Sequence, residues 1–401
     1  MKEILADLDR WRSGAVSAAV ARVVDLEGSG PRAPGAAMAV AADGEVVGSV
    51  SGGCVEGAVV SESFEVIDAG EGRIVSFGYS DDEAFAVGLT CGGTIHLYLE
   101  PLDWGPVHDA LSADLAAEAP AALATVIDGP GRGAKMLVRP EGLPSVGSLG
   151  EAGLDRAVQR DARGELTSGR SGLLNYSEHG EYFGHAGQCE PLDLVAAGGD
   201  AGDPGSEPAA AAAAHPAAAD GKVSVFVESF APPPQLLIFG AVDFTAALAR
   251  VGKVLGYRVT VCDARPVFAT AKRFPMADEV VVSWPGRLLD AAGAGLGPRD
   301  AVCVLTHDAK FDVPAITSAL ATEVGYIGVM GSRRTHDDRT ARLLEAGVTG
   351  EQLKRLRSPI GLDIGAATPE ETAVSIVSEI ISLRTGRHAE ALSDTTGPIH
   401  D

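Results

Sequence analysis

Two cysteines in this sequence stand beside a pair of glycines, where a thiol can do chemistry. Residues 51–57 read SGGCVEG after the strand-like run EVVGSV, and residues 90–94 read TCGGT before the run IHLYLE. A glycine pair between a strand and a helix exposes backbone N–H groups that bind anions, and the start of a helix favours the thiolate form of cysteine. A thiolate can hold a soft metal or carry sulfur. Cys54 and Cys91 are therefore the candidate catalytic residues.

The residues around these two thiols are candidates for binding a cofactor. They are Ser51, Gly52, Gly53, Glu56, Gly92 and Gly93. The negative charge of Glu56 works against a thiolate at Cys54, so the sequence leaves that ionisation open. The alternative for either cysteine is a small buried side chain that fills space near the glycines. The other three, Cys189, Cys262 and Cys303, lie in loop-like or apolar strand contexts and are interpreted as structural.

The loops that follow predicted strands in the C-terminal half form a second group of candidates. The turn FGAVDFTAAL (239–248) keeps only Gly240 of the fingerprint G-x-G-x-x-G, because Val242 and Thr245 stand where glycines are needed. Asp243 places a carboxylate where a phosphate would sit, and two charges about 4 Å apart repel by roughly 4 kcal/mol at an effective dielectric of about 20. The helix dipole returns only about 0.3–1 kcal/mol. We therefore expect no tight NAD binding in this turn.

Three further loops of this half carry residues that suit a nucleotide or a phosphate. Asp263 and Arg265 end the second strand, where an acid that binds ribose is expected, although an ion pair that fixes the strand end is an equally good interpretation. The other two loops carry Thr306-His307-Asp308 and Gly331-Ser332-Arg333-Arg334. A hydroxyl and two guanidiniums suit a phosphate group, and solvated arginines at a helix start are the alternative. For His307 the alternative is a hydrogen bond within a turn.

A weak internal repeat in the N-terminal part would position the first group. Residues 18–50 and 121–149 each hold a β-branched run, a Gly-rich loop, a second apolar run and a Gly-Ser turn. Each copy later ends in a strand-like run, HLYLEPL or SVFVESFAPP. When the two Gly-Ser turns are aligned, Gly153 stands opposite Cys54, so the fold has no need of that thiol. The repeat predicts a duplicated α+β unit over residues 1–230.

After three successive prolines at 232–234, short apolar runs alternate with helical segments. Strands are predicted at 235–239, 258–262, 279–282, 301–305 and 326–330, and helices at 244–255, 312–322, 334–346 and 369–383. Such alternation is typical of right-handed crossovers and a doubly wound parallel sheet, in which ligands bind beyond the carboxyl ends of the strands. Thr368 and Glu371 predict a capping box at the start of the last helix. The sequence thus predicts an α/β protein, with the duplicated α+β unit followed by the parallel sheet.

Composition and charge limit the classes of function. The chain has 401 residues, 46% of them hydrophobic and 22% charged, which suits two or three globular domains. The formal net charge is −23 and no basic patch stands out, which argues against nucleic acid and membrane surfaces as partners. No stretch approaches the roughly 18 apolar residues of a membrane span. Five dispersed cysteines without a CxxC pair indicate a reducing compartment, so we expect a cytoplasmic protein.

The expected domain boundaries follow from these patterns. We place a first unit at 1–115, a degenerate second copy at 116–230, the doubly wound domain at 231–385 and a disordered tail at 386–401. The second copy contains an insertion at 195–221 that is rich in Ala, Gly, Pro and Asp. This insertion has no periodic apolar face to bury, so we expect it to be flexible.

Six motifs together give the sequence a resemblance to the xanthine dehydrogenase accessory protein family (XdhC/CoxI). They are SVSGGCVEGAV, LTCGGT, RFPMAD, VLTHD, YIGVMGSRRT and SPIGLDIGAATPEETAVSIVSEII, and they cover both the N-terminal unit and a C-terminal Rossmann-like domain. The resemblance implies a maturation factor that binds the molybdenum cofactor (molybdopterin), assists its sulfuration with a cysteine desulfurase and delivers it to a xanthine or carbon-monoxide dehydrogenase. In this family Cys54 matches the motif cysteine, and Ser51, Gly52 and Gly53 match the glycine-rich turn.

The sequence departs from this family in one turn. The family's Rossmann turn commonly reads GAGHV, whereas this chain has GAVDF, with Val242 and Asp243 at the altered positions. The chain also lacks the cysteine sets that hold iron–sulfur clusters, so we do not expect it to be the dehydrogenase itself. We expect a cofactor-handling chaperone rather than a turnover enzyme, with no metal site of its own.

Two other functions stay open at this point. One is an NAD(P)-dependent oxidoreductase that uses Asp263 and Arg265, and the other is a non-catalytic scaffold for molybdoenzyme assembly. The expected partners are the target molybdenum hydroxylase and the cysteine desulfurase. Whether the chain forms a homodimer is left open.

Overall fold

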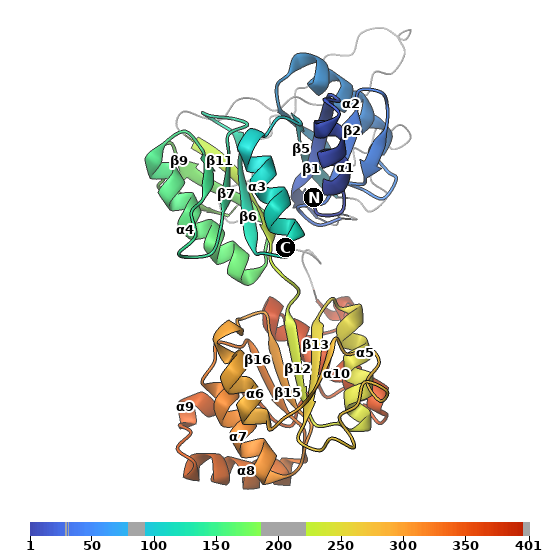
Figure 1. Ribbon diagram of the computed structural model, residues 1–401, viewed down its shortest axis with the longest axis vertical. Coiled ribbons are helices and arrows are strands. Elements are labelled where there is room, and N and C mark those ends of the chain that lie inside the picture. The colour runs from blue at the N-terminus through green and yellow to red at the C-terminus, as the bar shows by residue number, and fades with distance from the viewer. Residues whose placement is uncertain (29, 31, 79–92, 186–221, 396–401) are drawn as a thin grey trace. The chain divides into compact units, whose positions relative to one another are not determined.

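The computed structural model describes residues 1–28, 30, 32–78, 93–185 and 222–395 (Figure 1). The described chain divides into two compact units, an N-terminal unit that ends at Pro232 and a C-terminal unit of Pro233–Thr395. Cys91, Gly92 and the predicted insertion at 195–221 lie outside the described residues. Among the described helices, none has the length and apolar character that a membrane crossing requires.

The first repeat is a five-stranded antiparallel sheet with one helix packed on it. After helix α1 (Leu5–Ser13) come β1 (Ala18–Glu27), β2 (Ala37–Ala41), β3 (Val46–Gly48), α2 (Glu56–Ala69), β4 (Arg73–Phe77) and β5 (Thr94–Pro101). The strand order is β3-β2-β1-β5-β4. Val59 and Val66 of α2 share a buried cluster with Val23, Met38 and Leu97 of the sheet, so the helix covers one face.

The second repeat builds the same sheet from different residues. Helix α3 (Gly105–Ala116) leads into β6 (Ala121–Asp128), β7 (Lys135–Val138), β8 (Val146–Ser148), α4 (Ala152–Ser168), β9 (Gly172–Ser177), β10 (Tyr182–His185) and β11 (Lys222–Phe230). The strand order is β8-β7-β6-β11-β9, with β10 added at the edge, and it matches the first sheet strand for strand. The duplicated α+β unit predicted from the sequence is therefore confirmed.

The two repeats pack against each other through shared hydrophobic clusters. One cluster joins Trp11 and Val20 of the first repeat to Leu123 of the second, and a smaller one joins Tyr98 to Phe226. Both faces of β1 and β6 are consequently covered, and almost all of their residues are buried. This burial explains why the two strands read as nearly continuous apolar runs, interrupted by the buried polar residues Arg22 and Thr125, rather than as alternating patterns.

The C-terminal unit is a parallel sheet between two layers of helices (Figure 1). Its elements are β12 (Gln235–Phe239), α5 (Asp243–Val254), β13 (Arg258–Asp263), β14 (Glu279–Val282), α6 (Pro285–Ala292), β15 (Ala301–Val304), α7 (Ala309–Leu320), β16 (Tyr326–Val329), α8 (Arg333–Glu345), α9 (Gly350–Leu353), β17 (Leu356–Arg357) and α10 (Pro369–Thr385). The order is β14-β13-β12-β15-β16-β17, with all neighbours parallel. The predicted doubly wound sheet is confirmed.

The two faces of this sheet follow the two-residue period of its strands. Leu236 and Ile238 pack in the cluster that contains residues of α5 and α10. Leu237 and Phe239 pack in the cluster that contains residues of α6 and α7. Successive side chains of a strand point to opposite faces, so a short apolar strand such as QLLIF supports a helical layer on each side.

The last helix begins as the sequence predicts. The Thr368 hydroxyl accepts a hydrogen bond from the Glu371 amide, and the Glu371 carboxylate accepts one from the Thr368 amide, which confirms the capping box. Residues 386–395 of the segment predicted as a tail are described and include a short 3₁₀ helix, Leu392–Asp394.

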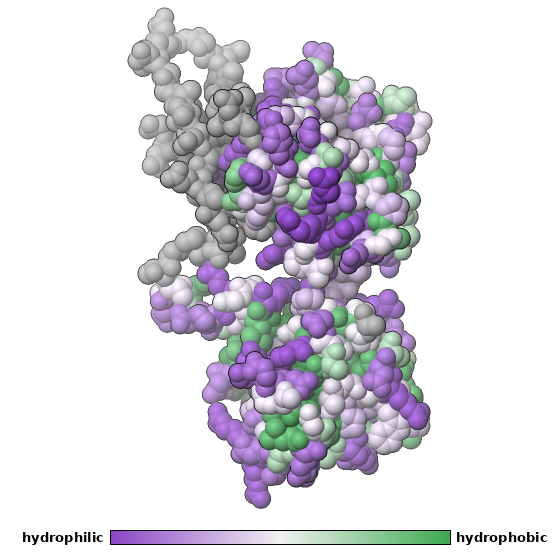
Figure 2. All heavy atoms as spheres, turned by 90° about the vertical axis from the view of Figure 1, so that its left-hand side faces the viewer, coloured by the Kyte–Doolittle hydropathy of each residue, from purple (hydrophilic) through white to green (hydrophobic). Residues whose placement is uncertain are grey.

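Hydrophilic side chains predominate on the face drawn in Figure 2, and hydrophobic ones gather in smaller patches, more of them on the C-terminal unit. The exposed large hydrophobic residues of that unit include Val267, Phe268 and Trp284. All three belong to loops that follow strands β13 and β14, at the edge of the sheet where ligands bind in folds of this kind.

Candidate functional site

The carboxyl ends of β12 and β15 meet at the centre of the parallel sheet. The chain runs outward from β12 to β13 and β14 and then crosses to β15, so this pair of strands is the topological switch point. Gly240 follows β12 with a φ of 110°, and a Cβ there would lie 2.8 Å from the Cγ2 atom of Thr306, which follows β15. Only glycine allows both this backbone conformation and this approach. The predicted site residues Gly240 and Thr306 are therefore neighbours.

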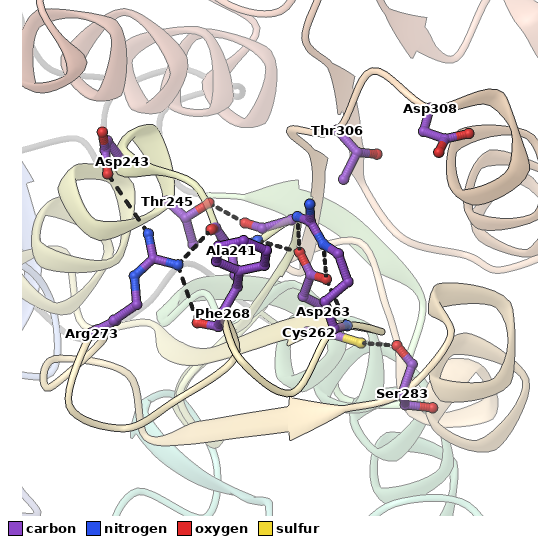
Figure 3. A network of polar contacts seen from close by, with 12 residues as sticks. Ala241, Asp243, Thr245, Cys262, Asp263, Phe268, Arg273, Ser283, Thr306 and Asp308 are labelled. Carbon is purple, nitrogen blue, oxygen red and sulfur yellow. Dashed lines mark hydrogen bonds and ion pairs between the residues drawn. The ribbon is translucent and has the colours of Figure 1, made fainter.

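Asp263, at the end of β13, is buried, and its carboxylate accepts four hydrogen bonds from the protein. One carboxylate oxygen accepts from the Arg265 amide and Nε, both at 2.9 Å, and the other accepts from the Ala241 amide at 2.8 Å and Arg265 Nη2 at 2.8 Å (Figure 3). Burial alone would raise the pKa of Asp263, but the hydrogen bonds from Arg265 and Ala241 lower it below its ordinary value. A carboxylate offers about four acceptor positions, and all are used. The geometry is that of an ion pair which fixes the strand end and leaves no acceptor for a ribose.

The backbone amides of the altered turn after β12 donate hydrogen bonds to groups within the protein. The Gly240 amide donates to the Cys262 carbonyl at 2.9 Å, the Ala241 amide to Asp263, and the Val242 amide to the Gly240 carbonyl at 3.1 Å. Thr245, which replaces the last glycine of the fingerprint, donates its hydroxyl to the Gly240 carbonyl. Few donors remain in this turn for the pyrophosphate of a dinucleotide.

Arg273 is a member of this network that the sequence reasoning missed. Its Nη1 atom donates to the carbonyls of Ala241 at 3.1 Å and Phe268 at 3.3 Å, and its Nη2 atom lies 3.8 Å from Asp243 (Figure 3). The guanidinium therefore offsets the carboxylate that the turn places at the start of α5. Arg273 opens the motif RFPMAD, and its position in that motif was the one signal that could have found it.

The loop after β15 is organised by local capping contacts and one buried acid. Asp308 caps α7 by accepting from the Lys310 amide at 3.1 Å and pairs with Lys310 Nζ at 3.0 Å. The Lys310 side chain lowers the pKa of Asp308. The Thr306 hydroxyl donates to Asp312, a buried residue of α7, whereas His307 is exposed.

A buried ion pair, also missed from the sequence, ties this loop to the next one. Arg339 of α8 donates through Nη2 to Asp312 at 3.0 Å and to the carbonyl of Met330, just after β16, at 2.9 Å. Both charged side chains are 4% exposed. Burial raises the pKa of Asp312, and Thr306 and Arg339 oppose this effect. The pair sets the spacing between the Thr306 loop and the Gly331–Arg334 loop.

The Gly331–Arg334 loop presents its charged groups to solvent. Ser332 caps α8 by accepting from the Thr335 amide at 3.2 Å. Arg333 and Arg334 are exposed and make no ion pair or side-chain hydrogen bond with the described part of the chain. These two guanidiniums are therefore available to an external anion.

In the N-terminal unit, the glycine turn before α2 is filled by the carboxylate of Glu56. One Glu56 oxygen accepts from the Ser49 hydroxyl at 2.6 Å and the Ser51 amide at 2.9 Å, and the other accepts from the Ser51 hydroxyl at 2.5 Å and the Gly53 amide at 2.9 Å. Burial would raise the pKa of Glu56, but these bonds outweigh it and hold the pKa at about 2. The anion in this turn is the protein's own carboxylate, where the sequence predicted an external one.

The second repeat contains an equivalent turn, in which a carboxylate also accepts hydrogen bonds from the residues before the helix. Asp155 accepts from the Ser148 hydroxyl and the Leu149 amide, both at 2.7 Å. Ser49 and Glu56 are seven residues apart, as are Ser148 and Asp155, so the alignment of the two Gly-Ser turns holds in three dimensions. An acid that closes the turn is thus a feature of the fold, and Cys54 is what distinguishes the first copy.

Cys54 is a free, half-buried thiol that packs at the margin of the core under α2. Its amide donates to the Ser51 hydroxyl at 3.0 Å, so the turn fixes its backbone.

Cys262 and Cys303 are fully buried, as expected of structural cysteines. Gly93 lies beside Gly28 at the end of β1. Within the described chain, no group of three or more His, Cys, Asp or Glu side chains is placed to hold a metal ion.

Comparison with known proteins connects both units to one family. A family model described as the XdhC Rossmann domain matches residues 236–380, and one described as the XdhC and CoxI family matches residues 11–78 and 114–177. A Bacillus subtilis protein named as a probable xanthine dehydrogenase subunit is 26% identical over 94% of this chain and 96% of its own length. The Escherichia coli "Molybdenum cofactor insertion chaperone PaoD" is 24% identical over 92% of this chain and 83% of its own length.

A solved structure agrees with these sequence relationships. A crystal structure from Bacillus halodurans, described as a xanthine dehydrogenase, has a TM-score of 0.57 and 26% identity, and the match covers 97% of this chain and 98% of that one. Similarity therefore extends over both units and not over the parallel sheet alone. The chain belongs to the XdhC and CoxI family.

Proposed function

We propose that this protein binds the molybdenum cofactor as cargo and inserts it into a molybdoenzyme of the xanthine dehydrogenase type. The observation that carries the proposal is the end-to-end similarity to a protein named as a molybdenum cofactor insertion chaperone, which spans both units of this chain. The similarity to a protein named as part of a xanthine dehydrogenase supports the class of client.

Two features of the structure suit such cargo. The cofactor carries a phosphate, and Arg333 and Arg334 are exposed guanidiniums without a partner in the described chain. It also carries sulfur and a soft metal centre, and Cys54 is a free thiol held on a fixed turn. In contrast, the Asp263 carboxylate and the turn after Gly240 use their donors and acceptors internally, which favours the chaperone over a nicotinamide-dependent oxidoreductase.

The sulfuration step assigns a specific role to Cys54. A cysteine desulfurase presents a persulfide, and the Cys54 thiolate attacks its outer sulfur to form a persulfide on Cys54 while the desulfurase cysteine leaves as a thiolate. The glycine turn and Glu56 would position the thiol for that attack. This role requires that solvent and the desulfurase reach Cys54, and its partial exposure allows such access.

The test is uptake of the cofactor by the purified chain. Molybdopterin released from a molybdoenzyme is mixed with the wild type, separated from free ligand, and measured as its fluorescent oxidised pterin. We expect stoichiometric uptake by the wild type. Sulfuration is measured separately, as the sulfur that cyanide releases from the bound cofactor after incubation with a cysteine desulfurase, and we expect a clear loss of it with Cys54→Ala. No uptake by the folded wild type would reject the chaperone function, and unchanged sulfuration by Cys54→Ala would reject the role of the thiol alone.

A further inference from the structure

A pocket of about 570 Å³ lies between the two repeats of the N-terminal unit. The first repeat lines it with Gly72, Tyr98 and Glu100, and Trp104 at the start of α3 adds an aromatic wall. Gly133 and Lys135 of the second repeat line the other side. The volume falls within the range of about 300–1,000 Å³ that is typical of sites for small ligands.

Two hydrogen-bond donors in the wall of this pocket have no partner in the described chain. They are the Tyr98 hydroxyl and the indole Nε1 of Trp104. Tyr98 is 0% exposed and Trp104 is 6% exposed. Burial raises the pKa of Tyr98, so its hydroxyl keeps its proton and can donate. Buried polar groups are nearly always paired, and two orphaned donors on residues that line one pocket are therefore an unusual cost.

Glycines make room for the Tyr98 hydroxyl. A Cβ at Gly72 would collide with this oxygen, and a Cβ at Gly133 would lie 3.9 Å from it. Both glycines line the pocket. The hydroxyl thus lies between two positions that carry no side chain, one from each repeat.

The internal repeat shows that the fold does not require this hydroxyl. Tyr98 of β5 pairs with Arg22 of β1, and the matching position of the second sheet pairs Phe226 of β11 with Thr125 of β6. Phe226 is equally buried and packs in the same cluster as Tyr98. A phenylalanine therefore performs the packing role, and the hydroxyl of Tyr98 is an addition that the core alone does not explain.

The pocket also offers acceptors beside these donors. Glu100 accepts from Arg22 Nη2 at 2.6 Å on one oxygen and from Lys135 Nζ on the other, which uses two of about four acceptor positions. Lys135 lies 5.2 Å from the centre of the Trp104 ring. Exposed Glu71 and Asp103 stand at the rim together with Arg132. The wall thus combines donors, carboxylates and aromatic surface.

We propose that this pocket binds the pterin ring of the cofactor. Tyr98 and Trp104 donate to the oxygen and nitrogen acceptors of the ring, and Glu100 accepts from its amino group. A planar heterocycle with an amino-oxo edge is the ligand class that uses both the orphaned donors and the carboxylate. This assignment rests on the proposed function, since that function supplies a pterin as cargo.

Removal of the Tyr98 hydroxyl tests the assignment in the full chain. The probe is free pterin, 2-amino-4-oxopteridine, followed by its fluorescence. Tyr98→Phe removes the donor and keeps the ring, so we expect pterin binding to weaken by about tenfold, whereas the melting temperature stays the same or rises because an unpaired buried hydroxyl has gone. A lowered melting temperature with unchanged binding would overturn the proposal.

Tyr176→Phe is the matched control. Tyr176 is also 0% exposed, but its hydroxyl donates to Asp161 at 3.0 Å. Removing this satisfied hydroxyl is expected to lower the melting temperature and to leave pterin binding unchanged. If both variants behave alike in both measurements, the Tyr98 hydroxyl has only a structural role and the proposal fails.

Two ligand analogues test the chemistry of the edge. Lumazine carries an oxo group in place of the amino group and is expected to bind more weakly than pterin, because Glu100 loses its donor. Guanosine shares the amino-oxo edge, and tighter binding of guanosine than of pterin would overturn the assignment to pterin. Uptake of the whole cofactor by the wild type is scored separately, so its absence rejects the proposed function, while an unaffected Tyr98→Phe variant rejects only this pocket.

Discussion

The Glu56 carboxylate closes back onto Ser51, five residues before it, and accepts hydrogen bonds from both the amide and the hydroxyl of that serine. The same serine hydroxyl accepts from the amides of Cys54 and Val55, each at 3.0 Å. The acid therefore fixes, through Ser51, the backbone that carries the thiol. Glu56 is a positioning residue for Cys54, and it fills the anion site that a glycine turn would otherwise offer.

Loss of this carboxylate is expected to impair the proposed sulfuration as well as stability. Glu56→Gln replaces one acceptor oxygen by an amide group that cannot accept the bonds now made, and we expect a loss of about 1–2 kcal/mol in unfolding free energy. Sulfuration that depends on Cys54 should fall at the same time, because the turn that carries the thiol is loosened. Urea unfolding and the sulfuration assay measure the two effects.

Asp155→Asn is the control for that experiment. It removes the equivalent acid in the second repeat, where no cysteine follows the turn. A similar loss of stability with normal sulfuration is expected. Equal losses of sulfuration in both variants would show that the activity follows the stability of the N-terminal unit and not the position of Cys54.

The pKa of Glu56 gives the protein an acid-sensitive contribution to its stability. The folded value of about 2 lies below the ordinary glutamate value of about 4.3, so the ionised form stabilises the fold. This contribution is fully present above about pH 4.3 and is lost as the pH falls toward about 2. Because Glu56 is partly solvated, we expect only about 1–2 kcal/mol.

The measurement compares the wild type with Glu56→Gln across this range. The difference in unfolding free energy between the two proteins should be largest near about pH 6 and should shrink at about pH 2.5, since Glu56 of the unfolded wild type is protonated there and the folded acid begins to take up its proton. A difference that does not change over this range would contradict the assigned hydrogen bonds.

Cysteine labelling should separate the half-buried thiol of Cys54 from the two buried thiols of the described chain. Cys54 is partly exposed, whereas Cys262 and Cys303 are buried. Burial raises the pKa of Cys262 to about 12 and raises that of Cys303 as well. Brief treatment of native protein with iodoacetamide should modify Cys54 and spare the other two until urea is added, because the thiolate is the nucleophile. Peptide mass spectrometry detects this, and equal labelling of all three would place Cys54 among the inert cysteines.

The Asp312–Arg339 pair should behave as a buried ion pair whose partners depend on each other. Arg339→Met leaves the Asp312 carboxylate buried without its cation, and we expect a loss of about 3–5 kcal/mol. The double variant Asp312→Leu, Arg339→Met removes both charges and should recover much of that loss. Urea unfolding of the three proteins tests the coupling, and a loss below about 1 kcal/mol for Arg339→Met would show that the charge is not needed.

Much of the fold could be predicted because its signals are local. The alternation of apolar strands and helices after Pro234, the capping box of Thr368 and Glu371, and the repeated Gly-Ser turns each depend on residues close together in the chain. Such patterns express the periods of strands and helices directly. The short helix α6 and strand β17 were missed, since eight residues and two residues carry too little periodicity to stand out.

The site was harder to predict because it depends on which polar groups form hydrogen bonds and ion pairs with each other. The sequence offered Asp263 and Arg265 equally as a ribose site and as an ion pair. The three hydrogen bonds between them, with a fourth from the Ala241 amide to Asp263, favour the pair. Glu56 was recognised as close to Cys54, but its partners Ser49 and Ser51 were not. Arg273, Asp312 and Arg339 were missed altogether, because the contacts of Arg273 with Ala241 and of Arg339 with Asp312 and Met330 span between 9 and 32 residues.

The sequence by itself determined the kinds of element, their order, the duplication and the membership of a family, because these follow from periodicity and from motifs within short stretches. Only the tertiary structure decided that Glu56 occupies the glycine turn, that Asp263 pairs with Arg265, and that Tyr98 and Trp104, which line one pocket, each carry an unpaired donor. The physical reason is the short distance over which a hydrogen bond can form. A hydrogen bond forms or fails within a few tenths of an ångström, and loops from distant parts of the chain are brought to that precision only by packing of the whole core.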